Sequence, residues 1–234
     1  MQVDEQSTVV REAGTGWPGH IGQVAIVGCG YVGSCLVAVL CERGVRVRAI
    51  DADAARIAAL RYGLCPIPEP GLAEALSAAA AEELVEYGGD LSMARSADVV
   101  IVTVGTPIDQ PLRDIAHELA QCLRPGQLII LKSTVPPGSA RALATALEDE
   151  TGLVCGYDFW VASSPERLAE GEALAQLREL PVVVGGVNPS STAAAVTFWR
   201  ALGLDVERMS SAETAEAVKL ASNWWIDANI ALAN

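Results

Sequence analysis

Features that mark several protein classes are scarce or missing in this chain of 234 residues. It has two histidines, and its six cysteines show no CxxC spacing, so the sequence offers no metal-ligand pattern. Only 16 basic residues stand against 29 acidic ones, for a formal net charge of −13. Such a charge repels phosphates, which argues against a general nucleic-acid or anionic-membrane partner. No apolar run reaches the roughly 18 residues needed to span a bilayer. We therefore predict no metal site, no nucleic-acid partner and no membrane partner.

The amino-terminal segment MQVDEQSTVVREAG is polar and charged, which does not fit a secretory signal. We interpret residues 1–21 as a flexible extension. The cysteines lie at positions 29, 35, 41, 65, 122 and 155. Their scattered placement favours reduced, mostly buried thiols, as is usual in cytoplasmic proteins, and a cytoplasmic location is the expectation.

What the chain does have is a large apolar fraction, 51% hydrophobic against 19% charged residues, which indicates a globular core. Short β-rich runs alternate with Ala/Leu/Glu-rich stretches. This alternation predicts an α/β fold with a Rossmann-like, doubly wound, mainly parallel sheet. The predicted strands are 24–27, 45–50, 84–87, 99–104, 128–132, 159–162, 182–184 and 204–208. The predicted helices are 33–43, 53–62, 71–82, 111–123, 138–151, 168–177 and 190–202.

From Ser210 the pattern changes to one long helix, SAETAEAVKLASNWWIDANIALAN, for which Ser210 and Glu213 form a plausible capping box. The helical pattern still continues at Asn234 without a stop signal. We expect the chain to be the front part of a longer protein that forms a homodimer through the region after residue 210, where the helix exposes Trp224 and Trp225. The predicted division is an extension (1–21), a dinucleotide-binding domain (22–209) and the start of a linking helix (210–234).

The most informative stretch is VAIVGCGYVGSCLVAVLCERGVRVRAID, residues 24–51. An apolar strand leads into a GxGxxG turn, an apolar helix, a second strand and an acidic residue, which together favour dinucleotide binding. The first glycine permits the turn, the second admits the pyrophosphate, and the third allows close helix packing. The carboxylate suits the ribose hydroxyls of NAD and repels the 2′-phosphate of NADP. The predicted NAD-binding residues of this stretch are Gly28, Gly30, Tyr31, Val32, Gly33 and Asp51.

Three further polar segments follow predicted strands, where a doubly wound sheet places its ligand site. They are Gly105-Thr106-Pro107, Lys132–Gly138 (KSTVPPG) and Ser163–Gly171 (SSPERLAEG). Each alone can be ordinary turn or helix-start chemistry. Because polar segments follow three successive strands, a ligand-binding site at the carboxyl ends of these strands is favoured.

On the long helix, Lys219, Asn223 and Asp227 are spaced i, i+4, i+8 and so share one stripe. An exposed, solvated stripe is the simpler interpretation. Apolar neighbours such as Ala217 and Val218 instead predict that the helix is largely buried. A buried ammonium beside an amide can stabilise a developing oxyanion.

The motifs GCGYVG, PIPEPGL, VGTP, KSTVPPGS, SPERLAEG and TAEAVKLASN…NIALAN, in this order over residues 23–234, resemble the UDP-glucose/GDP-mannose dehydrogenase family. The SPERLAEG and NIALAN segments are most similar to members acting on UDP-N-acetylhexosamines. The resemblance implies two successive NAD-dependent hydride removals at C6 of a UDP-sugar, through a cysteine-bound thioester, as in polysaccharide biosynthesis.

By the same resemblance, Thr134 and Glu166 would position water, while Lys219 and Asn223 would stabilise charge on the C6 oxygen. The implied catalytic residues are Thr134, Glu166, Lys219 and Asn223. The residues implied beside NAD, besides the glycine turn and Asp51, are Gly105, Thr106, Ser133, Thr134 and Glu166.

The chain departs from the family pattern in two main respects. The family's nucleophilic cysteine, in a G-x-C segment some fifty residues beyond Asn223, has no counterpart here, nor has the UDP-binding domain. Trp224-Trp225-Ile226 also stands where relatives often have smaller or aromatic residues followed by Arg. We therefore expect this chain to bind NAD without completing the oxidation, and the sugar stays unidentified. The alternatives are a fragment of a β-hydroxyacid dehydrogenase of the 6-phosphogluconate type and a non-catalytic NAD-sensing domain.

Overall fold

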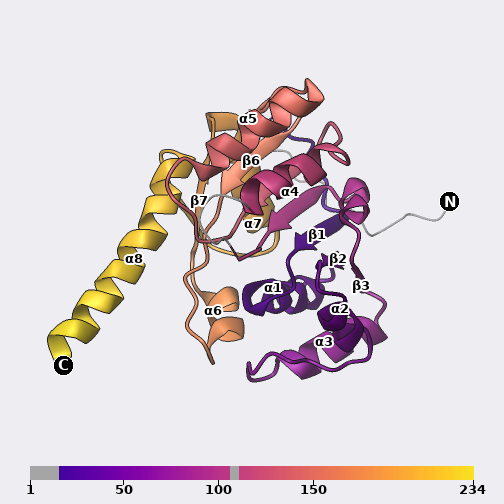
Figure 1. Ribbon diagram of the computed structural model, residues 1–234, viewed down its shortest axis with the longest axis vertical. Helices are drawn as coiled ribbons and strands as arrows, with labels where there is room; N and C mark the ends of the chain where they lie inside the picture. The colour runs from indigo at the N-terminus through magenta and orange to yellow at the C-terminus, as the bar shows by residue number, and fades with distance from the viewer. Residues whose placement is uncertain (1–15, 106–110) are drawn as a thin grey trace.

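The computed structural model describes residues 16–105 and 111–234. In this part of the chain, eight strands form one sheet in the order β3-β2-β1-β4-β5-β6-β7-β8 (Figure 1). Strands β1 to β6 run parallel, whereas β7 is antiparallel to β6 and β8 is parallel to β7. The strands are β1 (Gln23–Val27), β2 (Arg46–Ile50), β3 (Val85–Gly88), β4 (Val99–Val102), β5 (Leu128–Leu131), β6 (Trp160–Ser163), β7 (Val182–Gly186) and β8 (Val206–Arg208).

Helices cover both faces of the sheet, as the doubly wound prediction requires. One core packs α1, α2, α3 and α7 against one face, and a second core packs η1, α4 and α5 against the other. The helices are α1 (Tyr31–Glu42), α2 (Ala54–Arg61), α3 (Leu72–Ala81), η1 (Leu91–Ser96), α4 (Pro111–Ala120), α5 (Ser139–Thr151), α6 (Ala173–Glu179), α7 (Pro189–Ala201) and α8 (Ala212–Ala233). The mainly parallel, Rossmann-like fold predicted from the sequence is confirmed.

The central strands β4 and β5 have the sequences VVIV and LIIL, and all of their residues are buried. Unbroken apolar runs of this kind suit strands that are covered on both faces. The chain order of the strands reverses between β1 and β4. In an open parallel sheet, this reversal leaves a crevice at the carboxyl ends of the strands, which is the usual place for a ligand.

Helix α6 begins at Ala173, so the predicted helix at 168–177 starts too early. The preceding segment is instead a loop held by the buried carboxylate of Glu69. Glu69 accepts hydrogen bonds from the N–H groups of Gly171 (2.9 Å) and Leu174 (3.2 Å), and it also contacts the hydroxyl of Tyr31. A side chain about one hundred residues earlier thus sets where this helix starts.

Two local predictions near the ends of the chain are also corrected. The side-chain cap of α8 is Ser211, which accepts from the N–H of Thr214, rather than Ser210. Glu213 pairs with Arg141 of α5 instead of closing a capping box. The predicted extension over residues 1–21 is too long, because Trp17 is buried in the core.

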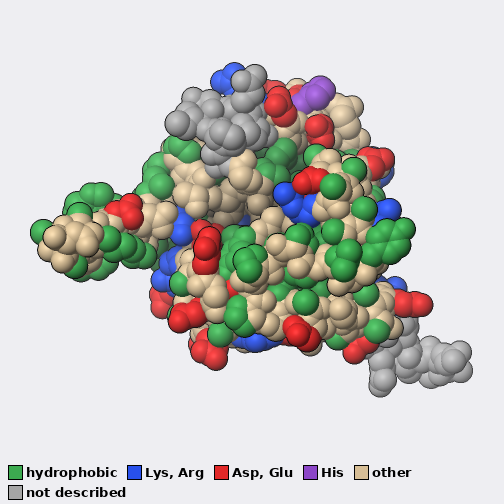
Figure 2. Space-filling view, turned by 60° about the horizontal axis from the view of Figure 1, so that its bottom comes forward, with side chains coloured by type: hydrophobic (Ala, Val, Ile, Leu, Met, Phe, Trp, Pro, Cys, Tyr) green, Lys and Arg blue, Asp and Glu red, His purple; other side chains and the backbone are tan. Residues whose placement is uncertain are grey.

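Helix α8 packs on the domain only through its first turns, where Ala212, Ala215, Glu216 and Lys219 are buried. Its remaining turns project from the body of the molecule (Figures 1 and 2). The prediction that this helix is largely buried is therefore wrong for its second half. In the described residues, no helix is both long enough and apolar enough to cross a membrane.

Candidate functional site

The glycine turn between β1 and α1 has the geometry that close backbone contact requires. Gly28 has φ +101°, a conformation that side chains disfavour, and its N–H donates to the carbonyl of Ile50 at 2.7 Å. A Cβ on Gly33 would lie 1.8 Å from the carbonyl oxygen of Gly28, so helix and turn pack without room for a side chain. A Cβ on Gly30 would meet nothing within 4 Å. The turn is thus closed toward the helix and open toward the crevice.

Asp51 follows β2 and supports the turn directly. Its carboxylate accepts hydrogen bonds from the N–H groups of Cys29 (2.6 Å) and Asp53 (2.8 Å). Burial opposes ionisation, but these bonds and a third from Arg56 outweigh it and hold the pKa of Asp51 below its usual value. The carboxylate is therefore ionised near neutral pH at the position predicted to meet a ribose.

Arg56 is a functional candidate that the sequence reasoning missed. Its guanidinium donates to Asp51 Oδ2 at 2.7 Å from the first turns of α2. In the sequence, the only indication is a basic residue five positions after Asp51. The start of α2 is what directs the Arg56 side chain back toward the Asp51 carboxylate. Because Arg56 is a cation beside Asp51, it reduces the repulsion that a 2′-phosphate would meet there.

Two cavities follow the carboxyl edge of the sheet. The first, of about 390 Å³, is lined by residues that include Gly28, Gly30, Asp51 and Arg56. The second, of about 370 Å³, is lined by Val32, Thr103, Val104, Gly105, Lys132, Ser133, Thr134 and Glu166. Thr103, Val104 and Gly105 line both cavities. The two spaces thus adjoin, as the two halves of a dinucleotide require.

The second cavity gathers residues from several elements that are distant in sequence. Glu166, after β6, forms an ion pair with Lys219 of α8, with Oε1 and Nζ 2.8 Å apart. Both side chains are largely withdrawn from solvent, and Thr134 and Ser133 lie on the same wall. Of the four predicted catalytic residues, Thr134 and Glu166 therefore line this cavity, and Lys219 is joined to it through its ion pair with Glu166.

Residues 22–202 match the family model described as "UDP-glucose/GDP-mannose dehydrogenase family, NAD binding domain". This match spans well over half of the chain. The chain belongs to the UDP-glucose/GDP-mannose dehydrogenase family. Its cofactor is therefore NAD, as the glycine turn and Asp51 predicted. The open space at Gly30 and the adjoining cavities fit that cofactor.

Curated relatives support this membership. UDP-N-acetyl-D-mannosamine dehydrogenase of Pyrococcus horikoshii is 30% identical over 218 residues, 91% of this chain and 52% of the relative. GDP-mannose 6-dehydrogenase of Pseudomonas putida is 30% identical over 226 residues, 91% of this chain and 51% of the relative. The chain thus spans about half the length of the curated relatives it matches.

Solved structures agree with the fold. The UDP-N-acetylmannosamine dehydrogenase of Pyrococcus horikoshii aligns with a TM-score of 0.85 at 29% identity, over 90% of this chain and 52% of that one. A ternary complex of GDP-mannose dehydrogenase from Pseudomonas aeruginosa gives 0.83 at 28% identity, over 91% and 51%. A 3-hydroxyisobutyrate dehydrogenase of Mycobacterium tuberculosis gives 0.61 at 20% identity, over 88% and 60%, a likeness of fold alone.

The remaining residues predicted from the family motifs and the helix stripe do not line the two cavities in the described part of the chain. Asn223, one turn beyond Lys219, is half-buried, and Asp227 is exposed on the projecting part of α8. The stripe predicted on this helix thus divides into a buried end at Lys219 and a solvated end at Asp227. Thr106 lies outside the described residues.

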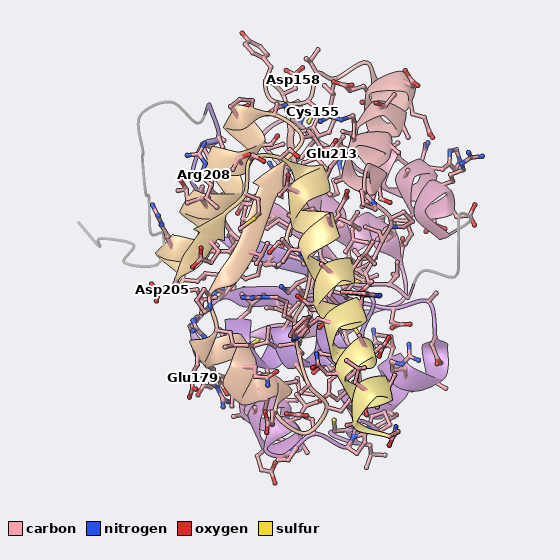
Figure 3. The ribbon with its side chains drawn as sticks, turned by 90° about the vertical axis from the view of Figure 1, so that its left-hand side faces the viewer. Cys155, Asp158, Glu179, Asp205, Arg208 and Glu213 are labelled. Carbon is pink, nitrogen blue, oxygen red and sulfur yellow. The ribbon has the colours of Figure 1, made fainter. Side chains whose placement is uncertain are left out.

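None of the six cysteines lines either cavity in the described part of the chain. All six are free thiols, and four of them are buried. Burial raises the pKa of the Cys29, Cys35 and Cys41 thiols to about 12, which makes them poor nucleophiles. Cys155 lies toward the end of the molecule where α8 begins, near Glu213 (Figure 3). No thiol is therefore placed to form a covalent intermediate at the cleft.

Proposed function

We propose that this chain is the NAD-binding part of a dehydrogenase that oxidises the C6 alcohol of a UDP-sugar to a carboxylate. NAD supplies the hydride acceptor, and one molecule is needed for each of the two oxidation steps. The observation that carries the proposal is the Glu166–Lys219 ion pair, which joins a loop after β6 to α8 beside the second cavity. The match to the NAD-binding family and the relatives' names support the same assignment.

In this proposal, Lys219 and Asn223 stabilise negative charge on the C6 oxygen. A largely buried ammonium is effective in this role, because low-dielectric surroundings strengthen its field. Lys219 meets that condition, since only 7% of its surface is exposed. Asn223 follows one helical turn later, where its amide can donate a hydrogen bond.

Thr134 and Glu166 would position a water molecule, and Glu166 would accept a proton from it. Both residues line the second cavity from neighbouring strand ends. Ser133 shapes the same wall, where its hydroxyl donates to the carbonyl of Val104 at 2.7 Å.

The chain by itself is proposed to bind NAD without completing the oxidation, because no thiol lines the cleft in the described residues. We further propose a homodimer through α8, whose projecting half exposes Trp224 and Trp225. A division into a dinucleotide-binding domain over 22–209 and a linking helix over 210–234 fits this arrangement. A cytoplasmic location stays a prediction.

Isothermal titration of the chain with NAD tests the assignment. We expect saturable binding with one site per chain. A Gly30→Ala variant should keep the free energy of unfolding but bind NAD at least about tenfold more weakly, because the new methyl enters the space left for the pyrophosphate.

A Gly33→Ala variant serves as the contrasting control. Its Cβ meets the backbone of Gly28 at 1.8 Å, so it should lose stability as well as binding. Unchanged NAD affinity in Gly30→Ala would contradict the placement of the cofactor. NADH production by this chain from UDP-glucose or UDP-N-acetylmannosamine would contradict the proposal that it binds NAD without completing the oxidation.

A further inference from the structure

The chain is unusual in its lysines. Of its 16 basic side chains only two are lysines, Lys132 and Lys219, and the rest are arginines. Both lysines are buried, with 3% and 7% of their surfaces exposed. Lysine is seldom buried, because taking an ammonium out of water costs free energy unless a partner offsets it. Lys219 has such a partner in Glu166, whereas the role of Lys132 needs another explanation.

Lys132 directly follows the buried strand β5 and forms part of the wall of the second cavity. Its ammonium donates to the carbonyl of Ser164 at 3.1 Å and lies 5.2 Å from the ring centroid of Trp199. Among the described residues, no carboxylate forms an ion pair with it. A carbonyl and an aromatic ring stabilise a cation without neutralising it, so Lys132 keeps a net positive charge at this wall.

The charged side chains around Lys132 do not cancel its positive charge. It interacts electrostatically with Glu166, Arg167 and Lys219. Glu166 is already paired with Lys219, and Arg167 donates to the carbonyl of Pro181 at 2.6 Å. These four described side chains thus carry three positive charges and one negative charge. A chain of net charge −13 therefore concentrates positive charge beside its second cavity.

A positive wall would act differently on the two redox forms of NAD. The nicotinamide ring carries a positive charge in NAD and none in NADH. Asp51 lines the first cavity, where a ribose of the adenosine half is expected, which assigns the nicotinamide half to the second. A fixed cation there disfavours the oxidised ring relative to the reduced one, and protein charges near a cofactor tune its electronics in this way.

We propose that Lys132 is a positioning and electrostatic residue that raises the reduction potential of the bound cofactor, so that the site binds NADH more tightly relative to NAD. This inference rests on the proposed function. A hydride, with its two electrons, leaves the sugar carbon and neutralises the ring, while the proton of the alcohol passes through the positioned water to Glu166. Lys132 would favour hydride transfer from the sugar to the cofactor, because it destabilises the positive charge of the nicotinamide ring, which the transfer removes.

The test compares dissociation constants for NAD and NADH by titration in Lys132→Met, Lys132→Arg and the unaltered chain. We expect Lys132→Met to lower the ratio Kd(NAD)/Kd(NADH) by about 3- to 10-fold, as one charge acting through a protein dielectric would. A tenfold change corresponds to about 30 mV for a two-electron couple. Lys132→Arg should keep the ratio within about twofold, because it retains the charge.

A variant of opposite sign keeps the inference testable if Lys132→Met fails to fold. Glu166→Gln removes the one negative charge of the cluster, so it should raise the same ratio. Arg46→Met is the matched control, since Arg46 is exposed at the amino end of β2, at the opposite edge of the sheet, and should leave the ratio unchanged.

Two results would overturn the inference. The first is an unchanged ratio in Lys132→Met, and equal weakening of both ligands there would indicate a purely structural role. The second is a fall of the ratio in Glu166→Gln. Failure of the unaltered chain to bind NAD would instead overturn the proposed function, so the two failures are distinguishable.

Discussion

Asp51 shows at the scale of one residue how a carboxylate can serve the fold and a ligand together. It holds the glycine turn through the N–H of Cys29 and the start of α2 through the N–H of Asp53. Arg56 neutralises part of its charge. Cofactor preference at this site therefore depends on the balance between one anion and one cation.

We expect the chain to bind NAD about 10- to 100-fold more tightly than NADP, because the 2′-phosphate would meet the Asp51 carboxylate. Asp51→Asn should weaken NAD binding and reduce the difference in affinity between NAD and NADP. Arg56→Ala should increase this difference in affinity, since it removes the cation that would face the 2′-phosphate of NADP. Competition titrations with both cofactors measure these ratios. Equal affinity of the unaltered chain for NAD and NADP would refute the assignment of Asp51.

Lys132 leads to a prediction about pH. Burial lowers its pKa to about 8, against roughly 10.4 in an unfolded chain. Between these values the unfolded state binds more protons, so this group makes the folded chain more stable as the pH rises from about 8 to about 10. Below pH 8 the ammonium is charged in both states, and its burial lowers stability.

Urea unfolding of the unaltered chain and of Lys132→Met at pH 7, 8, 9 and 10 checks this effect. The stability of the unaltered chain relative to the variant should rise by up to about 3 kcal/mol across the series. Buried thiols such as Cys41 titrate in the same range with the opposite sign. They occur in both proteins, so the difference isolates Lys132. A difference that stays constant with pH would show that Lys132 titrates normally.

At the scale of elements, α8 is joined to the start of α5 by two carboxylates. Glu216, which is fully buried, accepts from the N–H groups of Gly138 (2.6 Å) and Ala140 (2.8 Å). Gly138 provides no side-chain cap for α5, so Glu216 supplies the cap from another helix. Glu213, at the amino end of α8 (Figure 3), pairs with Arg141 at 2.7 Å. These contacts fix α8 where Lys219 reaches Glu166.

Glu216→Gln should lower the free energy of unfolding by about 1–2 kcal/mol, because an amide offers one acceptor where the carboxylate offers two and places an N–H against a donor. Glu213→Gln is the matched control and should cost no more than about 1 kcal/mol, since its ion pair is partly exposed. Urea unfolding near pH 7 gives both values. Equal losses in the two variants would show that Glu216 is not a special cap.

At the scale of the whole molecule, a compact doubly wound domain carries one projecting helix (Figure 2). The exposed part of α8 includes Trp224, Trp225, Ile226, Ile230 and Leu232. Trp224 and Trp225 are 69% and 65% exposed. A cluster of exposed large apolar side chains usually marks a place of association.

We expect the chain to sediment as a dimer at micromolar concentration and Trp224→Ser/Trp225→Ser to sediment as a monomer, because aromatic side chains contribute strongly to interfaces. Tyr157→Ser, which removes another exposed aromatic side chain, is the control and should leave the dimer intact. A monomeric unaltered chain at all concentrations would contradict association through α8.

Much of the fold was predictable because its signals are local. Apolar strands such as VVIV and LIIL, and the glycine turn, are readable from neighbouring residues alone. The loop that delays α6 was not predictable, since Glu69 comes from another part of the chain. The exposure of Trp224 and Trp225 was predicted, but the extent to which α8 is buried was overestimated, because an apolar composition does not reveal whether a partner surface is present.

The sequence by itself determined the doubly wound fold, the NAD-binding turn and the positions of Asp51, Thr134 and Glu166 after their strands. Backbone conformation and strand periodicity, which depend on near neighbours, are enough for these features. Only the tertiary structure decided that Lys219 pairs with Glu166 and that Lys132 is buried without an ion pair among the described residues. Charge balance in a site depends on which residues distant in sequence the fold brings within a few ångströms of each other.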